Sequence, residues 1–197
     1  MSRNEPTTRT RILEMAIGLL EAGGGAEVRM ADIARHAQVS RQAVYLHFGS
    51  RADLLIAATH HVDASLDLEA RLKPSRTASS GIERVALYVE FWGCYLPLVH
   101  GVASALIAMR ESDAAAAWDE REAALKDGCA GAVDQLIEDD SLAPCWERET
   151  AIALFWNQLS VANWERLTLE CGWTQTQYVQ RMQLLLNRTL VSAPFCA

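Results

Sequence analysis

The stretch that most constrains the fold of this chain runs from residue 29 to residue 51 and reads RMADIARHAQVSRQAVYLHFGSR. Its apolar residues recur at helical spacing in two groups, which predicts two short helices joined by a tight turn. Ser40 opens the second helix, where its hydroxyl can accept a hydrogen bond from an otherwise unpaired backbone N–H. Arg41 and Gln42 follow at once, and these side chains can pair bidentately with guanine and adenine edges. The pattern therefore predicts a helix-turn-helix whose second helix enters the major groove of DNA.

Two short amphipathic helices joined by a turn also occur in many all-α proteins, where they serve only as packing elements. Three details favour the DNA-binding interpretation. Ala34 is small where the two helices would cross, and Val39 can fill the inside of the turn. The aromatic run over residues 45–48 continues the second helix and ends at Gly49.

The same order and spacing of residues continue on both sides of this stretch. Residues 12–20 read ILEMAIGLL, Gly24 follows, and residues 30–55 read MADIARHAQVSRQAVYLHFGSRADLL. In these segments the chain resembles the N-terminal domain of the tetracycline-repressor (TetR) family of transcriptional regulators, over roughly residues 8–60. The resemblance implies a DNA-binding head. The rest of the chain resembles the family only in length and helical character.

Three positions depart from the family's usual pattern. Gly25 stands where an aromatic residue usually packs after the first helix. Arg29 replaces the Thr or Ser that usually caps the second helix, and an arginine there could reach a DNA phosphate instead. Gln38 replaces the usual glycine of the turn, which implies either a left-handed non-glycine residue or a slightly altered turn.

The exposed residues around the second helix divide into two expected roles. We expect Arg41, Gln42 and Ala43, on the first turn of that helix, to meet base edges. Phosphate contacts fix the register of a protein on DNA without reading its sequence. The residues expected to make them are Arg29, Ser40, Tyr45, His47 and Arg51.

The formal net charge of −7 conceals a difference between two parts of the chain. Residues 1–55 hold seven arginines against six acidic residues, whereas the remainder holds eleven basic and nineteen acidic residues. Because like charges repel, an acidic body joined to an arginine-bearing head favours approach to DNA by the head.

Several function classes find no support in the sequence. It contains no Glu-x-x-His pair, no G-x-S-x-G motif and no glycine-rich phosphate loop, so we expect neither an enzyme nor a cofactor. The N-terminus lacks an apolar signal sequence, and the longest apolar run (93–109) is interrupted by Pro97 and His100. Neither secretion nor a membrane partner is therefore expected. Cysteines stand at positions 94, 129, 145, 171 and 196, without a C-x-x-C pair or metal-ligand spacing. This predicts reduced thiols in the cytoplasm and no bound metal.

Helical periodicity without strand alternation predicts an all-α chain of about nine helices. A three-helix helix-turn-helix DNA-binding domain is expected over residues 1–50, and a helical ligand-binding and dimerisation domain over residues 51–197. Beyond the helix-turn-helix we expect a long helix over 51–72, a loop over 73–81, and a helical segment broken at Pro97. Further helices are expected over 114–140, 147–171 and 174–190.

The middle of the chain is rich in aromatic residues, and the whole chain holds six tryptophans. A cavity lined by aromatic side chains with a few polar groups suits an apolar small molecule, although the same residues also suit an ordinary aromatic core. The candidate ligand-binding residues are Phe91, Tyr95, His100, Met109, Trp118, Trp156 and Asn157. His100 and Asn157 would supply the polar groups, but a lone histidine in an apolar segment is more often a hydrogen-bonded core residue.

The last two expected helices carry apolar faces, which suit either the core of one chain or an interface. The resemblance implies that two such pairs, one from each subunit, form a four-helix dimer interface. The candidates on the last helix are Tyr178, Met182, Leu186 and Leu190.

A homodimer would place two reading helices about one DNA turn apart on a palindromic operator in double-stranded DNA. The function expected from the residues and the resemblance together is that of a homodimeric repressor, released from its operator by a small apolar effector ligand. Control by a protein partner, or by cysteine oxidation, is the alternative.

Overall fold

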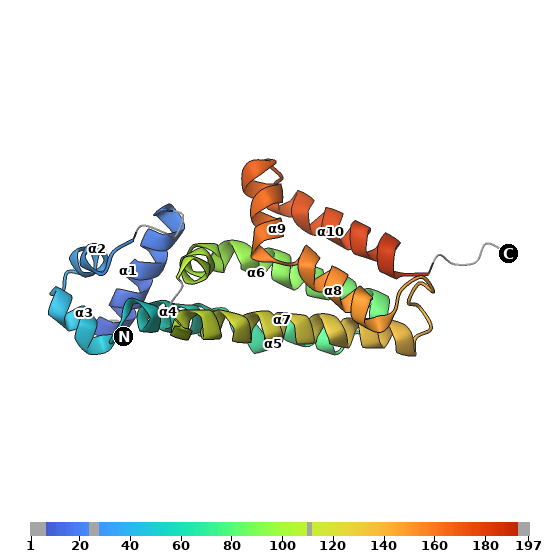
Figure 1. Ribbon diagram of the computed structural model, residues 1–197, viewed down its shortest axis with the longest axis horizontal. Coiled ribbons are helices and arrows are strands. Elements are labelled where there is room, and N and C mark those ends of the chain that lie inside the picture. The colour runs from blue at the N-terminus through green and yellow to red at the C-terminus, as the bar shows by residue number, and fades with distance from the viewer. Residues whose placement is uncertain (1–6, 24–27, 110–111, 193–197) are drawn as a thin grey trace, which may run out of the picture. The chain divides into compact units, whose positions relative to one another are not determined.

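The computed structural model describes residues 7–23, 28–109 and 112–192. Within these ranges it contains helices and no strand, and the nearest approach to a sheet is one isolated antiparallel bridge between Leu142 and Val191 (Figure 1). The helices are α1 (Thr8–Gly23), α2 (Met30–His36), α3 (Arg41–His47), α4 (Arg51–Ser65), α5 (Leu68–Arg76), α6 (Gly81–Ala108), α7 (Ser112–Glu138), α8 (Arg148–Gln158), α9 (Val161–Glu165), the π-helical segment η1 (Arg166–Glu170) and α10 (Gln175–Leu190). The all-α class is confirmed, with a helix count close to the expected nine.

The described residues form two compact units. One unit takes its residues from 1–66 and 98–120, and the other takes them from 67–97 and 121–197. The helix-turn-helix segment expected within residues 1–50 belongs to the first unit. The first unit also includes the end of α6 and the start of α7, so it extends well beyond the three helices expected of a DNA-binding head.

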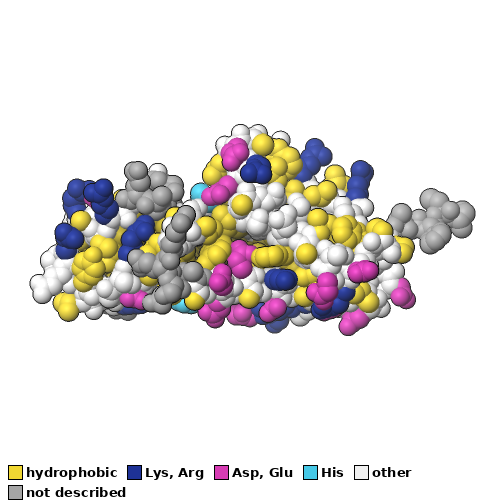
Figure 2. Space-filling model, viewed as in Figure 1, with side chains coloured by type: hydrophobic (Ala, Val, Ile, Leu, Met, Phe, Trp, Pro, Cys, Tyr) yellow, Lys and Arg dark blue, Asp and Glu magenta, His cyan; other side chains and the backbone are white. Residues whose placement is uncertain are grey.

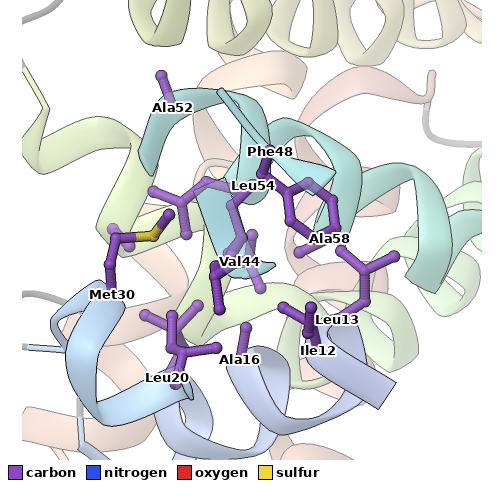
Figure 3. Close-up of a cluster of buried hydrophobic side chains, with 14 of the residues drawn as sticks. Ile12, Leu13, Ala16, Leu20, Met30, Val44, Phe48, Ala52, Leu54 and Ala58 are labelled. Atoms are coloured by element: carbon purple, nitrogen blue, oxygen red, sulfur yellow. The ribbon is translucent and has the colours of Figure 1, made fainter. Parts of the chain in front are cut away.

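An apolar core holds the first unit together. Four residues of α1, spaced to lie along one face, contribute to it and are fully or almost fully buried: Ile12, Leu13, Ala16 and Leu20. Figure 3 shows these side chains gathered with Val44 and Phe48 of the helix-turn-helix and with Leu54 and Ala58 of α4. Helix α6 joins the same core through Val102, Ala105 and Leu106.

The ends of several helices follow local sequence signals. Ser40, Ser50 and Ser160 cap α3, α4 and α9, and each hydroxyl accepts a hydrogen bond from a backbone N–H three residues later. Thr174 caps α10 in a capping box with Gln177, in which each side chain accepts from the other residue's backbone.

The single helix expected over residues 51–72 is wrong, because the structure divides it into α4 and α5. Asp67 lies between them in the left-handed conformation, with φ of 49°, and its carboxylate accepts a hydrogen bond from the Ala70 N–H. A left-handed residue cannot continue a right-handed helix, whereas an aspartate there can cap the next one. The helix expected over 147–171 is divided in a similar way, because Leu159 and Ser160 separate α8 from α9.

The break expected at Pro97 is also wrong, because α6 runs through it from Gly81 to Ala108. Proline removes one backbone hydrogen bond and strains the preceding turn, but burial on both sides can keep a helix continuous. By length and composition alone, α6 is apolar enough to cross a membrane, yet half of its most apolar stretch is buried inside the fold. We therefore assign α6 to the protein core.

The second unit is built around an aromatic cluster on α6. The Tyr88 ring meets Phe155 and Trp92 edge to face, with ring centroids 5.9 and 6.1 Å apart. Its hydroxyl donates a 2.9 Å hydrogen bond to the backbone carbonyl of Leu125. Gly128 is required on the facing turn of α7, because a Cβ there would lie 2.0 Å from the Tyr88 oxygen. These contacts fix the start of α6 against α7 and α8.

Candidate functional site

The first turn of α3 is presented outward by the core beneath it. Val44 is fully buried and Phe48 is 2% exposed, and they point toward α1 and α4 (Figure 3). Arg41 and Gln42 are exposed on the opposite side, and Ala43 is half-buried. The Ser40 hydroxyl accepts a 3.0 Å hydrogen bond from the Ala43 N–H. Packing and capping together hold the expected base-contacting residues in a defined orientation.

The turn before α3 adopts the first of the two forms that the sequence left open. Gln38 is left-handed, with φ of 55°. The Val39 N–H donates to the Ala34 carbonyl at 3.0 Å, and the Gln38 N–H donates to the Arg35 carbonyl at 3.2 Å. This pattern ends a helix in the same way as a glycine would, with a non-glycine residue in the left-handed position. The angle between α2 and α3 is therefore kept at some cost in backbone strain.

A concave surface of about 980 Å³ lies among α2, α3 and the start of α4. It brings together four of the expected DNA-contacting residues, namely Arg29, Arg41, Tyr45 and Arg51. Figure 2 shows Lys and Arg side chains gathered over the part of the first unit that carries α2 and α3. Among the described residues that line this surface, Asp32 is the acidic one, and it already pairs with Arg35 at 2.8 Å. The surface therefore offers positive charge to a phosphate backbone.

Arg29 and Arg51, which both line this surface, differ in the contacts that their side chains make within the chain. The Arg51 Nε donates a 3.3 Å hydrogen bond to the Val28 carbonyl, so this half-buried side chain helps to hold the segment before α2. Arg29 is exposed at the N-cap of α2 and makes no side-chain capping bond. Arg29 is thus the clearer candidate for a phosphate contact, whereas Arg51 combines positioning with charge.

Two residues near the surface were not identified from the sequence. The guanidinium of Arg9 lies 5.0 Å from the centre of the Phe48 ring, which places a cation beside the end of α3. Leu46 is 80% exposed on α3, the same helix as the exposed residue His47. Arg9 stands far from α3 in the sequence, so only the packing of α1 on Phe48 reveals its position.

The structure divides the seven expected ligand-binding residues between the two units. Met109 and Trp118 pack against the core of the first unit, and His100 lies in the same unit with its Nε2 3.2 Å from the Ser104 hydroxyl. In the second unit, Phe91 and Tyr95 line a cavity of about 360 Å³ between α5 and α6.

The remaining two expected ligand residues lie on α8. The Trp156 indole donates a 2.7 Å hydrogen bond to Glu122, and Lys126 lies 5.3 Å from the centre of its ring. Asn157 is exposed to solvent. The indole N–H of Trp156 is therefore already hydrogen-bonded within the chain.

A larger cavity of about 450 Å³ lies wholly within the second unit, among α5, the first half of α6 and α7. Its apolar wall includes Leu68, Leu72, Tyr88 and Trp92. Its charged wall includes Arg76, Arg84 and Arg121 together with two carboxylates, Glu69 and Asp127. The volume falls in the range of small-molecule sites, about 300–1,000 Å³.

The sequence interpretation missed this cavity because its polar wall comes from three separate helices. A signal was nonetheless present on each helix. Arg84, Tyr88 and Trp92 recur every four residues on α6 and so share one face. The same spacing joins Leu72 to Arg76 on α5. A face that combines arginines with aromatic residues, rather than apolar residues alone, would have been the pattern to seek.

The four residues expected at the dimer interface are core residues of a single chain. Tyr178, Leu186 and Leu190 are fully buried within it and Met182 is 3% exposed. Side chains that are already covered have little further area to bury against a second copy, so the burial of these four residues does not favour the interface expected for them. The exposed apolar residues of α10 are Leu184 and Leu185, at 41% and 42%.

No metal site or reactive thiol cluster is evident among residues 7–23, 28–109 and 112–192. They contain no group of three or more potential metal-ligating side chains. Burial raises the pKa of the Cys129 thiol, whereas Cys94, Cys145 and Cys171 are exposed. Cys196 and Gly25, which the sequence analysis considered, lie outside the described residues.

Comparison with known proteins agrees with this geometry. Residues 12–58 match the family described as bacterial regulatory proteins, tetR family. Among solved structures, the fold is similar to that of a protein described as a transcriptional regulator from Saccharomonospora viridis, in complex with choline. That likeness has 18% identity, covers 94% of this chain and 98% of that one, and has a TM-score of 0.79.

Two further structures show the same fold. The transcriptional regulator FadR from Bacillus subtilis, in complex with stearoyl-CoA, has 16% identity, coverage of 89% of this chain and 96% of that one, and a TM-score of 0.71. NalD, the secondary repressor of the MexAB-OprM multidrug efflux pump in Pseudomonas aeruginosa, has 21% identity, coverage of 96% and 98%, and a TM-score of 0.66. A search of curated proteins by sequence found no match. The expected family resemblance is thereby confirmed, on the helix-turn-helix segment and on the fold.

Proposed function

We propose that the chain is a sequence-specific transcriptional regulator, because residues 12–58 match the family described as bacterial regulatory proteins, tetR family. The proposal specifies a homodimeric repressor that leaves a palindromic operator when a small ligand binds. The observation that carries it is the concave surface where Arg29, Arg41 and Tyr45 lie beside the exposed first turn of α3.

The residues of this surface would divide their work as protein–DNA interfaces usually do. Arg29, Tyr45, His47 and Arg51 would contact phosphates and set the register. Arg41 and Gln42 would read base edges in the major groove, because their side chains offer bidentate donors and acceptors. Ser40 fixes the start of α3 through its capping bond and can also approach a phosphate.

Two matched arginine variants test this assignment on DNA fragments recovered by the protein from a random pool. Arg41→Ala should cost about 1–3 kcal/mol of binding free energy, because it removes a base contact. Arg166→Ala is the control, since that exposed side chain lies on η1 in the second unit and does not line the surface. Binding measured by fluorescence anisotropy should separate the two. Equal affinities for both variants and the unchanged protein would show that the reading face is misassigned.

The phosphate role is tested by salt dependence. Arg29→Ala should weaken binding to all sequences alike and reduce the slope of log affinity against log salt by about one. A slope unchanged by Arg29→Ala would remove this residue from the interface.

Release by a ligand requires that the ligand prefer a conformation that binds DNA poorly. Helix α6 is suited to carry such a preference. Tyr88 and Trp92 line the larger cavity before Pro97, while Val102 and Leu106 belong to the core of the DNA-binding unit after it. Helix α4, which begins at Arg51 and packs in the same core as the helix-turn-helix, is a second candidate for this coupling, and α6 adds a direct covalent connection.

The linkage between the two sites is reciprocal and can be measured from either side. A coupling of about 1–3 kcal/mol would lower operator affinity roughly 5- to 150-fold, and operator DNA would weaken ligand binding by the same factor. A compound that binds equally well with and without operator is not the effector.

The proposed homodimer would use the outward face of α10 rather than its buried face. Arg181, Leu184, Leu185 and Arg188 recur at helical spacing on the exposed side. Leu185→Glu should therefore produce a folded monomer in sedimentation experiments. Ile137→Glu on α7 is the matched control, because Ile137 and Leu185 are both 42% exposed. A dimer that survives Leu185→Glu places the interface elsewhere.

The alternative, control by a protein partner or by cysteine oxidation, is favoured by one observation, the exposure of three thiols. Mild oxidation that abolishes operator binding, with recovery on reduction, would establish it. Under either form of control we propose a cytoplasmic protein without catalytic activity, a membrane partner or a cofactor.

A further inference from the structure

The larger cavity of the second unit differs in chemistry from the apolar pocket that the sequence suggested. Three arginines face two carboxylates on its wall, in a part of the chain that is otherwise acidic. A guanidinium cannot lose its charge at any ordinary pH, so each arginine needs an acceptor or solvent. The distribution of partners among the three arginines therefore shows what a ligand must supply.

Two of the three arginines are already engaged. Arg76 pairs with Glu69 through two contacts, of 2.5 and 3.4 Å, and this pairing lowers the pKa of the Glu69 carboxyl. Arg121 donates a hydrogen bond to the Tyr95 hydroxyl, and its guanidinium lies 6.0 Å from the centre of that ring. Arg84 takes part in neither of these contacts.

Arg84 is half-buried and lines the cavity. Within the part of the chain that the structure describes, no carboxylate forms an ion pair with it and no acceptor binds its side-chain N–H groups. The Arg84 guanidinium lies against Gly131, because a Cβ added at Gly131 would stand 2.5 Å from a terminal nitrogen of Arg84. Asp134 is near enough for Arg84 to lower its pKa, but Arg148 holds that carboxylate at 2.6 and 2.9 Å.

A second donor in the wall also lacks an acceptor. The indole N–H of Trp92 is buried and completes no hydrogen bond within the described residues. Burial raises the pKa of the neighbouring Tyr88 hydroxyl, and the Trp92 indole lowers it by a smaller amount. The Tyr88 hydroxyl donates its own proton to the Leu125 carbonyl. A buried donor without a partner is rare and costly, so this one marks a place where a ligand oxygen fits.

From these contacts we propose that the cavity binds an amphipathic organic carboxylate. The carboxylate accepts hydrogen bonds from Arg84 and from the Trp92 indole, while its apolar body lies against Leu68, Leu72 and Tyr88. The inference rests on the proposed ligand-controlled regulator and adds the charge and shape of its effector. The proposed ligand is an anion, whereas the similar structure described above holds the cation choline. An unpaired guanidinium in this cavity would repel a quaternary ammonium ion.

The test uses the full chain and three probes that share one hydrocarbon tail: octanoate, octanol and octyltrimethylammonium. Binding is measured by titration calorimetry and by tryptophan fluorescence, below the concentration at which each probe forms micelles. Octanoate should bind roughly tenfold or more tightly than either other probe, as expected for a charge-assisted hydrogen bond in a partly buried site. Binding of the ammonium probe as tight as that of octanoate, or no binding of any probe, overturns the proposal.

Variants locate the headgroup. Arg84→Gln should weaken octanoate roughly tenfold or more and leave octanol unchanged. Trp92→Phe keeps the aromatic wall and should weaken octanoate alone, by a smaller factor. Arg166→Gln, an exposed change on η1, is the control and should alter nothing. Equal loss for octanoate and octanol in Arg84→Gln contradicts the assigned headgroup, and if that variant does not fold, Trp92→Phe decides.

Operator binding without any probe is measured in parallel, so the two proposals can fail separately. Selective octanoate binding by a protein that recovers no DNA supports the cavity chemistry and refutes the regulator. DNA binding by a protein whose cavity prefers the cation retains the regulator and refutes the carboxylate.

Discussion

Replacing Gly101 by alanine should destabilise the DNA-binding unit, because this residue lets α6 lie directly on α1. A Cβ at position 101 would stand 2.6 Å from both the carbonyl carbon and the carbonyl oxygen of Leu20, and 2.7 Å from the Glu21 nitrogen. Ordinary van der Waals contact begins near 3.4 Å, and backbone atoms cannot turn away as a flexible side chain can. The two helices would have to separate.

The magnitude follows from two opposing effects. Overpacking of this kind typically costs about 1–3 kcal/mol, while replacing a helical glycine by alanine returns about 1 kcal/mol. Because the clashing atoms belong to the backbone, the cost should lie in the upper part of this range, at about 2–3 kcal/mol, so we expect a net loss of about 1–2 kcal/mol of unfolding free energy. Gly18→Ala on α1 is the matched control, since nothing lies within 4 Å of its added Cβ, and it should gain about 0.5–1 kcal/mol.

Urea denaturation followed by circular dichroism measures both variants. The midpoint should fall for Gly101→Ala and rise for Gly18→Ala, with similar slopes for both. If Gly101→Ala were as stable as Gly18→Ala, α6 would not pack on α1, and its proposed part in transmitting ligand binding to the head would lose its basis.

Four further predictions follow from local features. Arg29→Ser should stabilise α2 by about 0.5–1 kcal/mol through a new N-cap, yet weaken operator binding, as thermal melts and anisotropy would show together. Gln38→Gly should raise the melting temperature by relieving a left-handed residue, and a lower value would mean that lost chain entropy outweighs the strain. Cys129 should resist thiol reagents until urea unfolds the chain, whereas the exposed Cys94, Cys145 and Cys171 should react in the native protein. Because Arg148 lowers the pKa of Asp134 from its ordinary 3.8, their pairing should stabilise the fold above that pH and be lost as pH falls below it. If the free energy of unfolding fell with decreasing pH in the same way in Arg148→Gln as in the unchanged protein, this pairing would be contradicted.

The helix-turn-helix could be predicted because its determinants are local. Ser40 caps α3 whatever the rest of the chain does, and Val44 and Phe48 share one helical face by spacing alone. The conformation of Gln38 could be narrowed to two forms, and the structure selects the left-handed one. Signals that act within a few residues are therefore readable without tertiary structure.

The structural features that could not be predicted from the sequence depend on which other parts of the fold cover a given helix face. Pro97 lowers helix propensity locally, but packing along α6 overrides it. The spacing of Tyr178 and Leu186 predicts an apolar face on α10, and periodicity cannot tell whether the same chain or a second copy covers that face. Arg84 and Arg121 meet on one cavity wall although 36 intervening residues separate them in the sequence. Only the packed fold brings such positions together.

The central claim is that the first turn of α3 reads DNA sequence, and motif selection from a random double-stranded pool tests it most directly. The unchanged protein should enrich an inverted repeat with half-site centres about one helical turn apart. Arg41→Ala should enrich the same repeat with preference relaxed at one base pair in each half-site, whereas Arg166→Ala, a change on η1 away from the surface, should recover the original motif. Enrichment of no motif, or of one that Arg41→Ala leaves unchanged, would contradict the account.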